Sequence, residues 1–256
     1  MTVRSASEEI VIYITAGFAT APDFLDRFGA ALAACFEQAG ARVRVVIHFP
    51  YGDWSRQRQK QLREITSDLW NNAHGKPSRY GGKSLTRLIA NHLNPDQKLL
   101  LVGHSAGAVA SIQAAGALMK EGVPILGVIQ IGSPKCAIPP ELTNRVLYLN
   151  ATNQLDQKMD PIPRLGTWGG WMKSRLGVHR WHRMKHAPVH RITLPIIGGH
   201  ADYFRDHKPY VWQDATNLQT TIEVIWTWLT QLEEHEENEE NEDHRGQITE
   251  KEDEHD

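Results

Sequence analysis

The segment LLLVGHSAGAVA, residues 99–110, joins an apolar run to a run of small residues around Ser105. The apolar run predicts a buried strand, and the alanine-rich end predicts a helix. A sharp strand-to-helix turn strains its central residue, and glycines two places before and after it, Gly103 and Gly107, remove side chains that would collide with the turn's neighbours. The free N–H groups of the helix start suit a developing oxyanion. The segment therefore favours a nucleophilic serine over a simple small-residue turn.

Five other apolar runs alternate with helical patterns along the chain. With the run before Ser105, the predicted strands are residues 10–15 and the runs ending at residues 49, 103, 132, 152 and 197. The predicted helices are residues 23–38, 53–70, 84–93, 108–120 and 216–232. Strands that alternate with helices predict an α/β fold: a mostly parallel sheet of about six strands with helices on both faces.

Length and charge divide the chain into a body and a tail. The 256 residues, 41% of them hydrophobic, can form one core, which predicts a single domain over residues 1–232 with a basic, Trp/His-rich insertion or cap at about 165–190. Residues 233–256 contain 13 Asp or Glu, which leaves 26 basic and 17 acidic residues in the body, a net charge of +9. The acidic tail has almost no apolar residues and is predicted to be disordered.

Two segments that follow Ser105 in the chain contain an acid and then a histidine, which could act as its catalytic partners. NQLDQKMDPIPRLG follows the strand ending at residue 152 and contains Asp156 and Asp160, and GGHADYF follows the strand ending at residue 197 and contains His200. An imidazole can accept the serine proton, and a carboxylate can orient the imidazole. Either aspartate could fill that role, and His200 could also be a surface histidine on a glycine turn.

At this point the chain resembles the α/β-hydrolase superfamily, as a pattern of elements over residues 10–232. The motifs DPIPRL and GGHADYF are also similar to the acid and histidine motifs of class 3 (fungal-type) lipases. That resemblance implies Asp160 as the acid, His200 as the base and Tyr203 packed near His200. It implies a serine esterase or lipase that cleaves a carboxylic ester through an acyl-enzyme, with no cofactor and no metal.

The oxyanion hole requires two backbone donors. One is expected to be the N–H of Ala106, directly after the nucleophile. The loop TAGFATAPDF after the first strand is similar to the His-Gly-aromatic loops of the superfamily and implies the N–H of Phe18 as the second donor. Ala16 stands where the superfamily usually has histidine, and Gly17 and Phe18 could instead form a tight turn with a core aromatic.

The segment MKSRLGVHRWHRMKHAPVHR, residues 172–191, is basic and rich in histidine, and tryptophans lie close by. Such a surface could contact anionic lipid, or it could be a plain solvated cap. His182 and His186 have helical spacing, but no acidic or cysteine ligand accompanies them, so a zinc site is not favoured. The basic body could also attract nucleic acid, which the acidic tail argues against.

The remaining features leave the substrate and oligomeric state open. The expected partner is a small acyl ester, while a thioesterase or lysophospholipase on the same triad, or a non-catalytic ligand- or partner-binding protein of the same fold, stays possible. No signal peptide or membrane span is expected from the apolar runs. Cys35 and Cys136 are interpreted as reduced packing residues, which favours a cytoplasmic protein.

Overall fold

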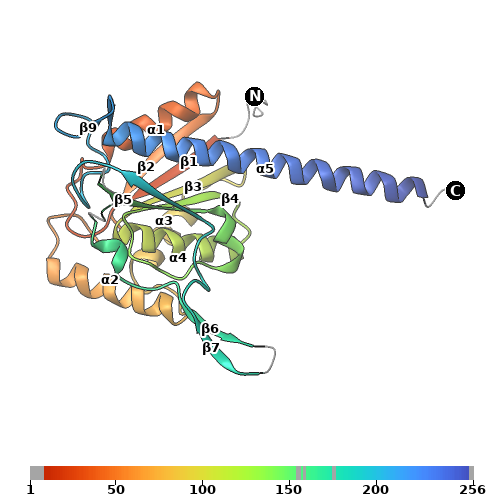
Figure 1. Cartoon of the computed structure of the whole chain (residues 1–256), viewed down its shortest axis with the longest axis horizontal. Coiled ribbons are helices and arrows are strands. Elements are labelled where there is room, and N and C mark those ends of the chain that lie inside the picture. Colours follow the sequence, from red (N-terminus) through yellow and green to blue (C-terminus); the bar gives the residue numbers. More distant parts are fainter. Residues whose placement is uncertain (1–8, 154–156, 158–159, 175–176, 254–256) are drawn as a thin grey trace.

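Six parallel strands form one sheet in the computed structural model, which describes residues 9–153, 157, 160–174 and 177–253 (Figure 1). The sheet order is β2-β1-β3-β4-β5-β8, and each neighbouring pair is parallel. The strands are β1 (Glu9–Thr15), β2 (Arg42–His48), β3 (Gln97–His104), β4 (Ile125–Ile131), β5 (Val146–Thr152) and β8 (His190–Pro195). The six predicted strands are therefore confirmed, each ending within two residues of its expected position.

Helices cover both faces of the sheet, which explains why its central strands are apolar along their whole length. Helix α1 (Asp26–Gln38) and the start of α5 (Asn217–Asp253) pack on one face. Helices α3 (Gly81–Ala90) and α4 (Ala106–Lys120) pack on the other, with α2 (Arg58–Ala73) against them. The two apolar clusters are separated by the sheet, so β1, β3 and β4 contribute buried side chains to both.

The chain changes direction across the sheet between β1 and β3. From β1 it passes through α1 to β2 on one side, and it then returns to β3 on the other side of β1. The loops after β1 and β3 consequently diverge at the carboxyl edge of the sheet, the position where open α/β sheets bind their ligands. Gly17 lies in the first of these loops, and Ser105 directly follows β3.

The crossover from β5 to β8 carries the segment that the sequence predicts as an insertion or cap. It contains the short 3₁₀ helix η2 (Ile162–Arg164) and an antiparallel hairpin of β6 (Gly170–Lys173) and β7 (His179–His182). The hairpin extends away from the body in Figure 1. Its base is tied to the loop after β4, because the Lys135 N–H donates to the Leu165 carbonyl at 2.8 Å and the Thr167 N–H donates to the Lys135 carbonyl at 3.0 Å.

Helix α5 is longer than the helix predicted at residues 216–232. Its first turns are anchored by Ile225, Trp228 and Leu229, all buried, and the helix then extends past the body to Asp253 (Figure 1). The sequence predicts disorder from residue 233, whereas the described helix continues through this stretch. Its many glutamates favour helix, and no proline interrupts it. Within the described residues, no helix is both long enough and apolar enough to cross a membrane.

Small elements complete the chain. The 3₁₀ helix η1 (Pro140–Arg145) leads into β5. After the turn that contains His200, a two-residue-strand hairpin of β9 (Val211–Trp212) and β10 (Ala215–Thr216) leads into α5.

Candidate active site

Ser105 stands at a strained turn between β3 and α4. Its backbone has φ 57° and ψ −133°, in the positive-φ half of conformational space that non-glycine residues rarely adopt. A Cβ on Gly103 would lie 2.2 Å from the Cα of Ala108, and a Cβ on Gly107 would lie 2.6 Å from the carbonyl oxygen of Thr15. The turn is fixed to the sheet because the Ser105 N–H donates to the Ile131 carbonyl at 3.0 Å. Strain held by such tight packing is typical of a functional position.

His200 and Asp160 meet beside the carboxyl ends of β4 and β5. Nδ1 of His200 lies 2.9 Å from Oδ2 of Asp160, whose side chain is fully buried, while the His200 side chain is 27% exposed. An ionised carboxylate can only accept hydrogen bonds, so the proton lies on Nδ1 and Nε2 is left free to accept one. The Ile162 N–H also donates to Oδ1 of Asp160 at 2.9 Å. Both carboxylate oxygens are therefore held in place.

Tyr203 links this pair to strand β5 through its hydroxyl. Its hydroxyl donates to Oδ2 of Asp160 at 2.9 Å and accepts from the Ala151 N–H at 2.8 Å. Burial, followed by the charge of the Asp160 carboxylate, raises the pKa of Tyr203 far above its usual value, so the hydroxyl stays a donor. This tyrosine fixes the carboxylate relative to strand β5.

His104, directly before Ser105, stacks on His200. The ring centroids are 4.7 Å apart with an interplanar angle of 27°, and Nε2 of His104 lies 2.9 Å from the carbonyl oxygen of His200. Burial, followed by the neighbouring His200, lowers the pKa of His104 to about 3. His104 is thus a neutral donor that holds the backbone of His200.

The loop after β1 lies against the serine turn. A Cβ on Gly17 would come within 2.6 Å of the Ala106 nitrogen and 3.0 Å of the Ser105 Cβ, so only glycine fits there. The next residue, Phe18, has a 43% exposed side chain. The two predicted oxyanion donors, Ala106 and Phe18, therefore belong to adjoining segments.

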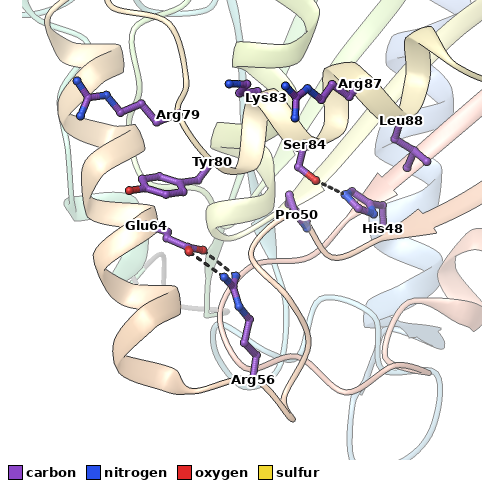
Figure 2. Close-up of a pocket in the computed structure, with 10 residues that line it drawn as sticks. All are labelled: His48, Pro50, Arg56, Glu64, Arg79, Tyr80, Lys83, Ser84, Arg87 and Leu88. Atoms are coloured by element: carbon purple, nitrogen blue, oxygen red, sulfur yellow. Dashed lines mark hydrogen bonds and ion pairs between the residues drawn. The ribbon is translucent and has the colours of Figure 1, made fainter.

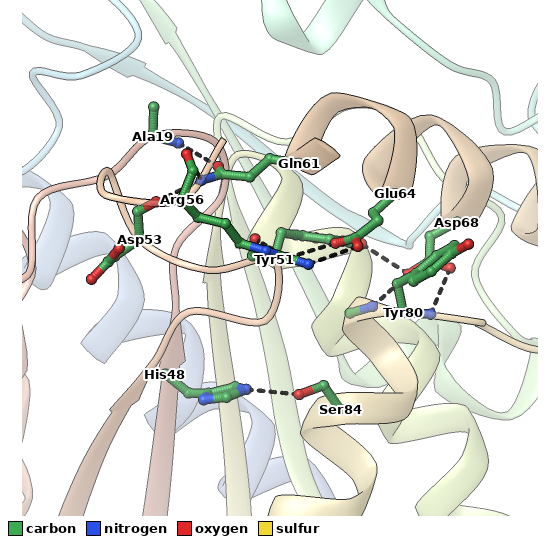
Figure 3. A network of polar contacts seen from close by, with 11 residues as sticks. Ala19, His48, Tyr51, Asp53, Arg56, Gln61, Glu64, Asp68, Tyr80 and Ser84 are labelled. Atoms are coloured by element: carbon green, nitrogen blue, oxygen red, sulfur yellow. Dashed lines mark hydrogen bonds and ion pairs between the residues drawn. The ribbon is translucent and has the colours of Figure 1, made fainter. Parts of the chain in front are cut away.

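Gln61, which supports this loop from α2, has no sequence pattern that predicts a functional role. Its side chain is fully buried; Oε1 accepts from the Ala19 N–H at 2.9 Å, and Nε2 donates to the carbonyl of Asp53 (Figure 3). Ala19 has a positive φ of 49°. A single buried glutamine thus holds the strained residue next to Phe18, and only the fold brings the two segments together.

The structure joins some of the predicted residues and leaves others apart. His200 and Asp160 form a hydrogen bond, and the stacked ring of His104 links His200 to the residue before Ser105. Among the described residues, the Ser105 hydroxyl has no hydrogen-bond partner. Such bonds are often long in the unliganded state of an active site. The alternative acid, Asp156, lies outside the described residues.

A separate pocket of about 610 Å³ lies between α2, α3 and the loop after β2 (Figure 2). It contains none of the predicted catalytic residues. The lining residues are His48, Pro50, Arg56, Glu64, Arg79, Tyr80, Lys83, Ser84, Arg87 and Leu88. Glu64 accepts from both terminal nitrogens of Arg56, at 2.7 and 2.8 Å. The net charge of the lining is positive, because the only carboxylate in it is paired with Arg56 while Arg79, Lys83 and Arg87 also line the pocket.

Asp68 organises the wall of this pocket. Its carboxylate accepts from the N–H groups of Arg79 and Gly81 at 2.9 and 2.8 Å, and from the hydroxyl of Tyr51 at 3.2 Å (Figure 3). These bonds satisfy free N–H groups at the start of α3. Asp68 therefore has a structural role in joining α2 to α3.

No group of three or more His, Cys, Asp or Glu side chains within the described part of the chain is arranged to hold a metal ion. His182 and His186, whose spacing suggested a helical pair, lie in and after strand β7. They are not on a common helix face, because the segment forms a hairpin.

A six-stranded parallel sheet, helices on both faces and a strained serine after the central strand define the α/β-hydrolase fold, as the sequence predicted. No protein-family model and no curated protein matches the chain.

Solved structures similar to the chain include a thioesterase, RedJ, from the prodiginine pathway of Streptomyces coelicolor, with 14% identity, 86% of each chain covered and a TM-score of 0.48. YbtT, a type II thioesterase of the yersiniabactin pathway, has 14% identity over 92% of this chain and 95% of its own, with a TM-score of 0.44. A pyrethroid hydrolase, PytH, has 12% identity over 87% and 98%, with a TM-score of 0.43. Likeness at this level indicates no reaction or substrate for this chain.

Proposed function

We propose that the chain is a serine hydrolase that cleaves carboxylic esters, in the manner of a lipase or esterase, through a covalent acyl-enzyme. The observation that carries this proposal is the hydrogen bond of 2.9 Å between Nδ1 of His200 and Oδ2 of the buried Asp160. It makes Nδ1 of His200 the donor and leaves Nε2 as the nitrogen that can act as a base, in a fold whose strained turn presents Ser105. No other part of the described chain combines these features.

In the proposed reaction, Nε2 of His200 takes the hydroxyl proton as the Ser105 oxygen bonds to the ester carbonyl carbon. The negative oxygen of the tetrahedral intermediate accepts hydrogen bonds from the N–H groups of Ala106 and Phe18. Asp160 stabilises the imidazolium. His200 then returns the proton to the alcohol oxygen as the carbon–oxygen bond breaks. Water attacks the acyl-enzyme by the same proton path and releases the carboxylic acid.

The expected substrate is a small acyl ester, and the lipase-like motifs around Asp160 and His200 favour an acyl chain on one side of the bond. The same groups would attack a thioester or a lysophospholipid. The choice among them depends on the acyl pocket and on the alcohol or thiol that leaves, and the motifs do not specify either.

Labelling by a fluorophosphonate probe tests this proposal. We expect the folded wild type to be labelled, Ser105→Ala to lose the label and His200→Ala to lose most of it. Asp160→Asn should lower kcat for a p-nitrophenyl ester by about 10⁴-fold, the effect of replacing a triad carboxylate by an amide. Asp156→Asn should change little.

Matched controls separate chemistry from folding. Ser84→Ala and His92→Ala alter exposed side chains on and after α3 and should keep full labelling. Paired acyl esters and thioesters of equal chain length rank the two substrate classes. A folded wild type that is not labelled, or a labelled Ser105→Ala, would refute the proposal and favour a non-catalytic binding protein.

A further inference from the structure

The hairpin formed by β6 and β7 has no side that packs on the body. Every described residue from 171 to 174 and from 177 to 185 is exposed. Five of these are large apolar side chains with 42–64% exposure, namely Trp171, Met172, Val178, Trp181 and Met184. Isolated exposed apolar residues are normal, but a cluster of this kind on one projecting element marks an interaction site.

A contact between Trp171 and Trp181 stabilises the hairpin, which has no buried core of its own. Trp171 is directly opposite Trp181 across the strands, with ring centroids 5.6 Å apart in an edge-to-face arrangement. The Lys185 ammonium adds a bond of 2.8 Å to the Trp171 carbonyl. By contrast, Trp168 at the hairpin base is buried and packs on Tyr148 at 4.8 Å. Trp168 therefore anchors the hairpin, while Trp171 and Trp181 remain available at its surface.

The charge of this element has one sign. From residue 161 to residue 201 the sequence contains no Asp or Glu. The described cations of the hairpin are Lys173, Arg180, Arg183 and Lys185, and none forms an ion pair with a described carboxylate. Basic side chains beside interfacial tryptophans are the combination that an anionic membrane surface attracts, since tryptophan favours the headgroup region and each cation gains from the surface potential.

We propose that this hairpin is a docking surface for an anionic lipid surface. Trp171 and Trp181 enter the headgroup layer, and Lys173, Arg180, Arg183 and Lys185 contact lipid phosphates. The inference goes beyond the proposed hydrolase activity and does not depend on it. The surface lies in the crossover between Asp160 and His200, so docking would bring the membrane to the part of the chain that carries both residues.

Vesicle flotation with the Ser105→Ala protein tests the proposal without hydrolysis of the lipid. We expect binding to vesicles of phosphatidylglycerol mixed with phosphatidylcholine, weak binding to phosphatidylcholine alone, and a steep loss of binding at high ionic strength. Each cation replaced by glutamine should weaken binding roughly fivefold, the factor that corresponds to ~1 kcal/mol per charge at such a surface. Lys173→Gln with Arg180→Gln should therefore cost roughly 25-fold.

Exposed residues elsewhere supply the matched controls. Trp70 on α2 is 63% exposed, against 62% for Trp171, so Trp70→Ala should leave binding unchanged while Trp171→Ala with Trp181→Ala weakens it. Arg63→Gln with Lys76→Gln is the corresponding control for charge. Equal binding to neutral and anionic vesicles, or an equal loss of binding in the control variants, would overturn the proposal. Absence of vesicle binding would also overturn it, and a dimer that the hairpin variants dissociate would then identify a second copy of the chain as the partner.

Discussion

Replacing Gly132 by alanine should disable the site without altering any predicted catalytic residue. Gly132 follows β4 and has φ 55°. A Cβ there would lie 2.7 Å from Oδ2 of Asp160, 2.9 Å from Cε2 of Tyr203 and 3.2 Å from Nδ1 of His200. One methyl group would thus meet all three members of the hydrogen-bonded group that orients the imidazole.

Two effects set the magnitude. Alanine at a positive φ loses about 1–2 kcal/mol of stability. Ordinary contact begins near 3.4 Å, so the Asp160 oxygen must also retreat by about 0.7 Å. Because a misplacement approaching 1 Å can lower a rate by about 10²-fold, we expect kcat to fall by that factor.

Gly122→Ala is the matched control, since Gly122 has φ 80° and a Cβ there would meet nothing within 4 Å. Urea unfolding should show the loss of stability from a positive φ in both variants, with a further loss from the close contacts in Gly132→Ala. The hydrolysis of a p-nitrophenyl ester should show a loss of kcat only in Gly132→Ala. A folded Gly132→Ala protein that retains kcat within about threefold would refute the reasoning, as the effect of misplacement is about 10²-fold.

Three further changes probe the supports of the site. Tyr203→Phe leaves the buried N–H of Ala151 without its acceptor and should cost about 1–3 kcal/mol in urea unfolding, with a smaller stability change contradicting the buried bond. Gln61→Leu releases the strained Ala19 beside Phe18 and should lower kcat by up to about 10²-fold with little change in KM. That factor is the smallest effect expected when one oxyanion donor is lost. A change in KM without a change in kcat would contradict this role of Gln61. The pKa of His104 is about 3 in the folded protein and about 6.5 in the unfolded chain, which binds more protons between these values. Stability should therefore fall as pH drops through this window, by about 1.4 kcal/mol per pH unit, and His104→Asn should remove that part of the slope in unfolding measured across the window.

The sheet could be predicted because each strand is a local signal. The runs 10–15 and 99–103 are apolar on both faces, which only a covered parallel strand requires. The serine turn was equally local, since Gly103 and Gly107 lie two residues from Ser105. Chain order indicated His200 and one of two aspartates, Asp156 or Asp160, and only the resemblance to lipase motifs implied Asp160. The structure brings Asp160 and His200 into contact.

The supports of the site depend on contacts between distant segments and could not be predicted. Gln61 meets Ala19 across 42 residues, and His104 meets the His200 backbone across 96. Gly132 resembles any glycine at a strand end until the fold places Asp160 against it. The hairpin was missed for another reason: its strands have no buried face, so the alternation that identifies a strand is absent.

The bond between Asp160 and His200 closes a loop of 40 residues, and the hairpin lies inside that loop. Both ends are fixed independently of it, Asp160 by Tyr203 and the Ile162 N–H, and His200 by His104. Doubling the length of a closed loop costs only about 0.6 kcal/mol of chain entropy. The crossover is therefore a place where evolution or engineering can exchange one surface module for another while the chemistry stays unchanged.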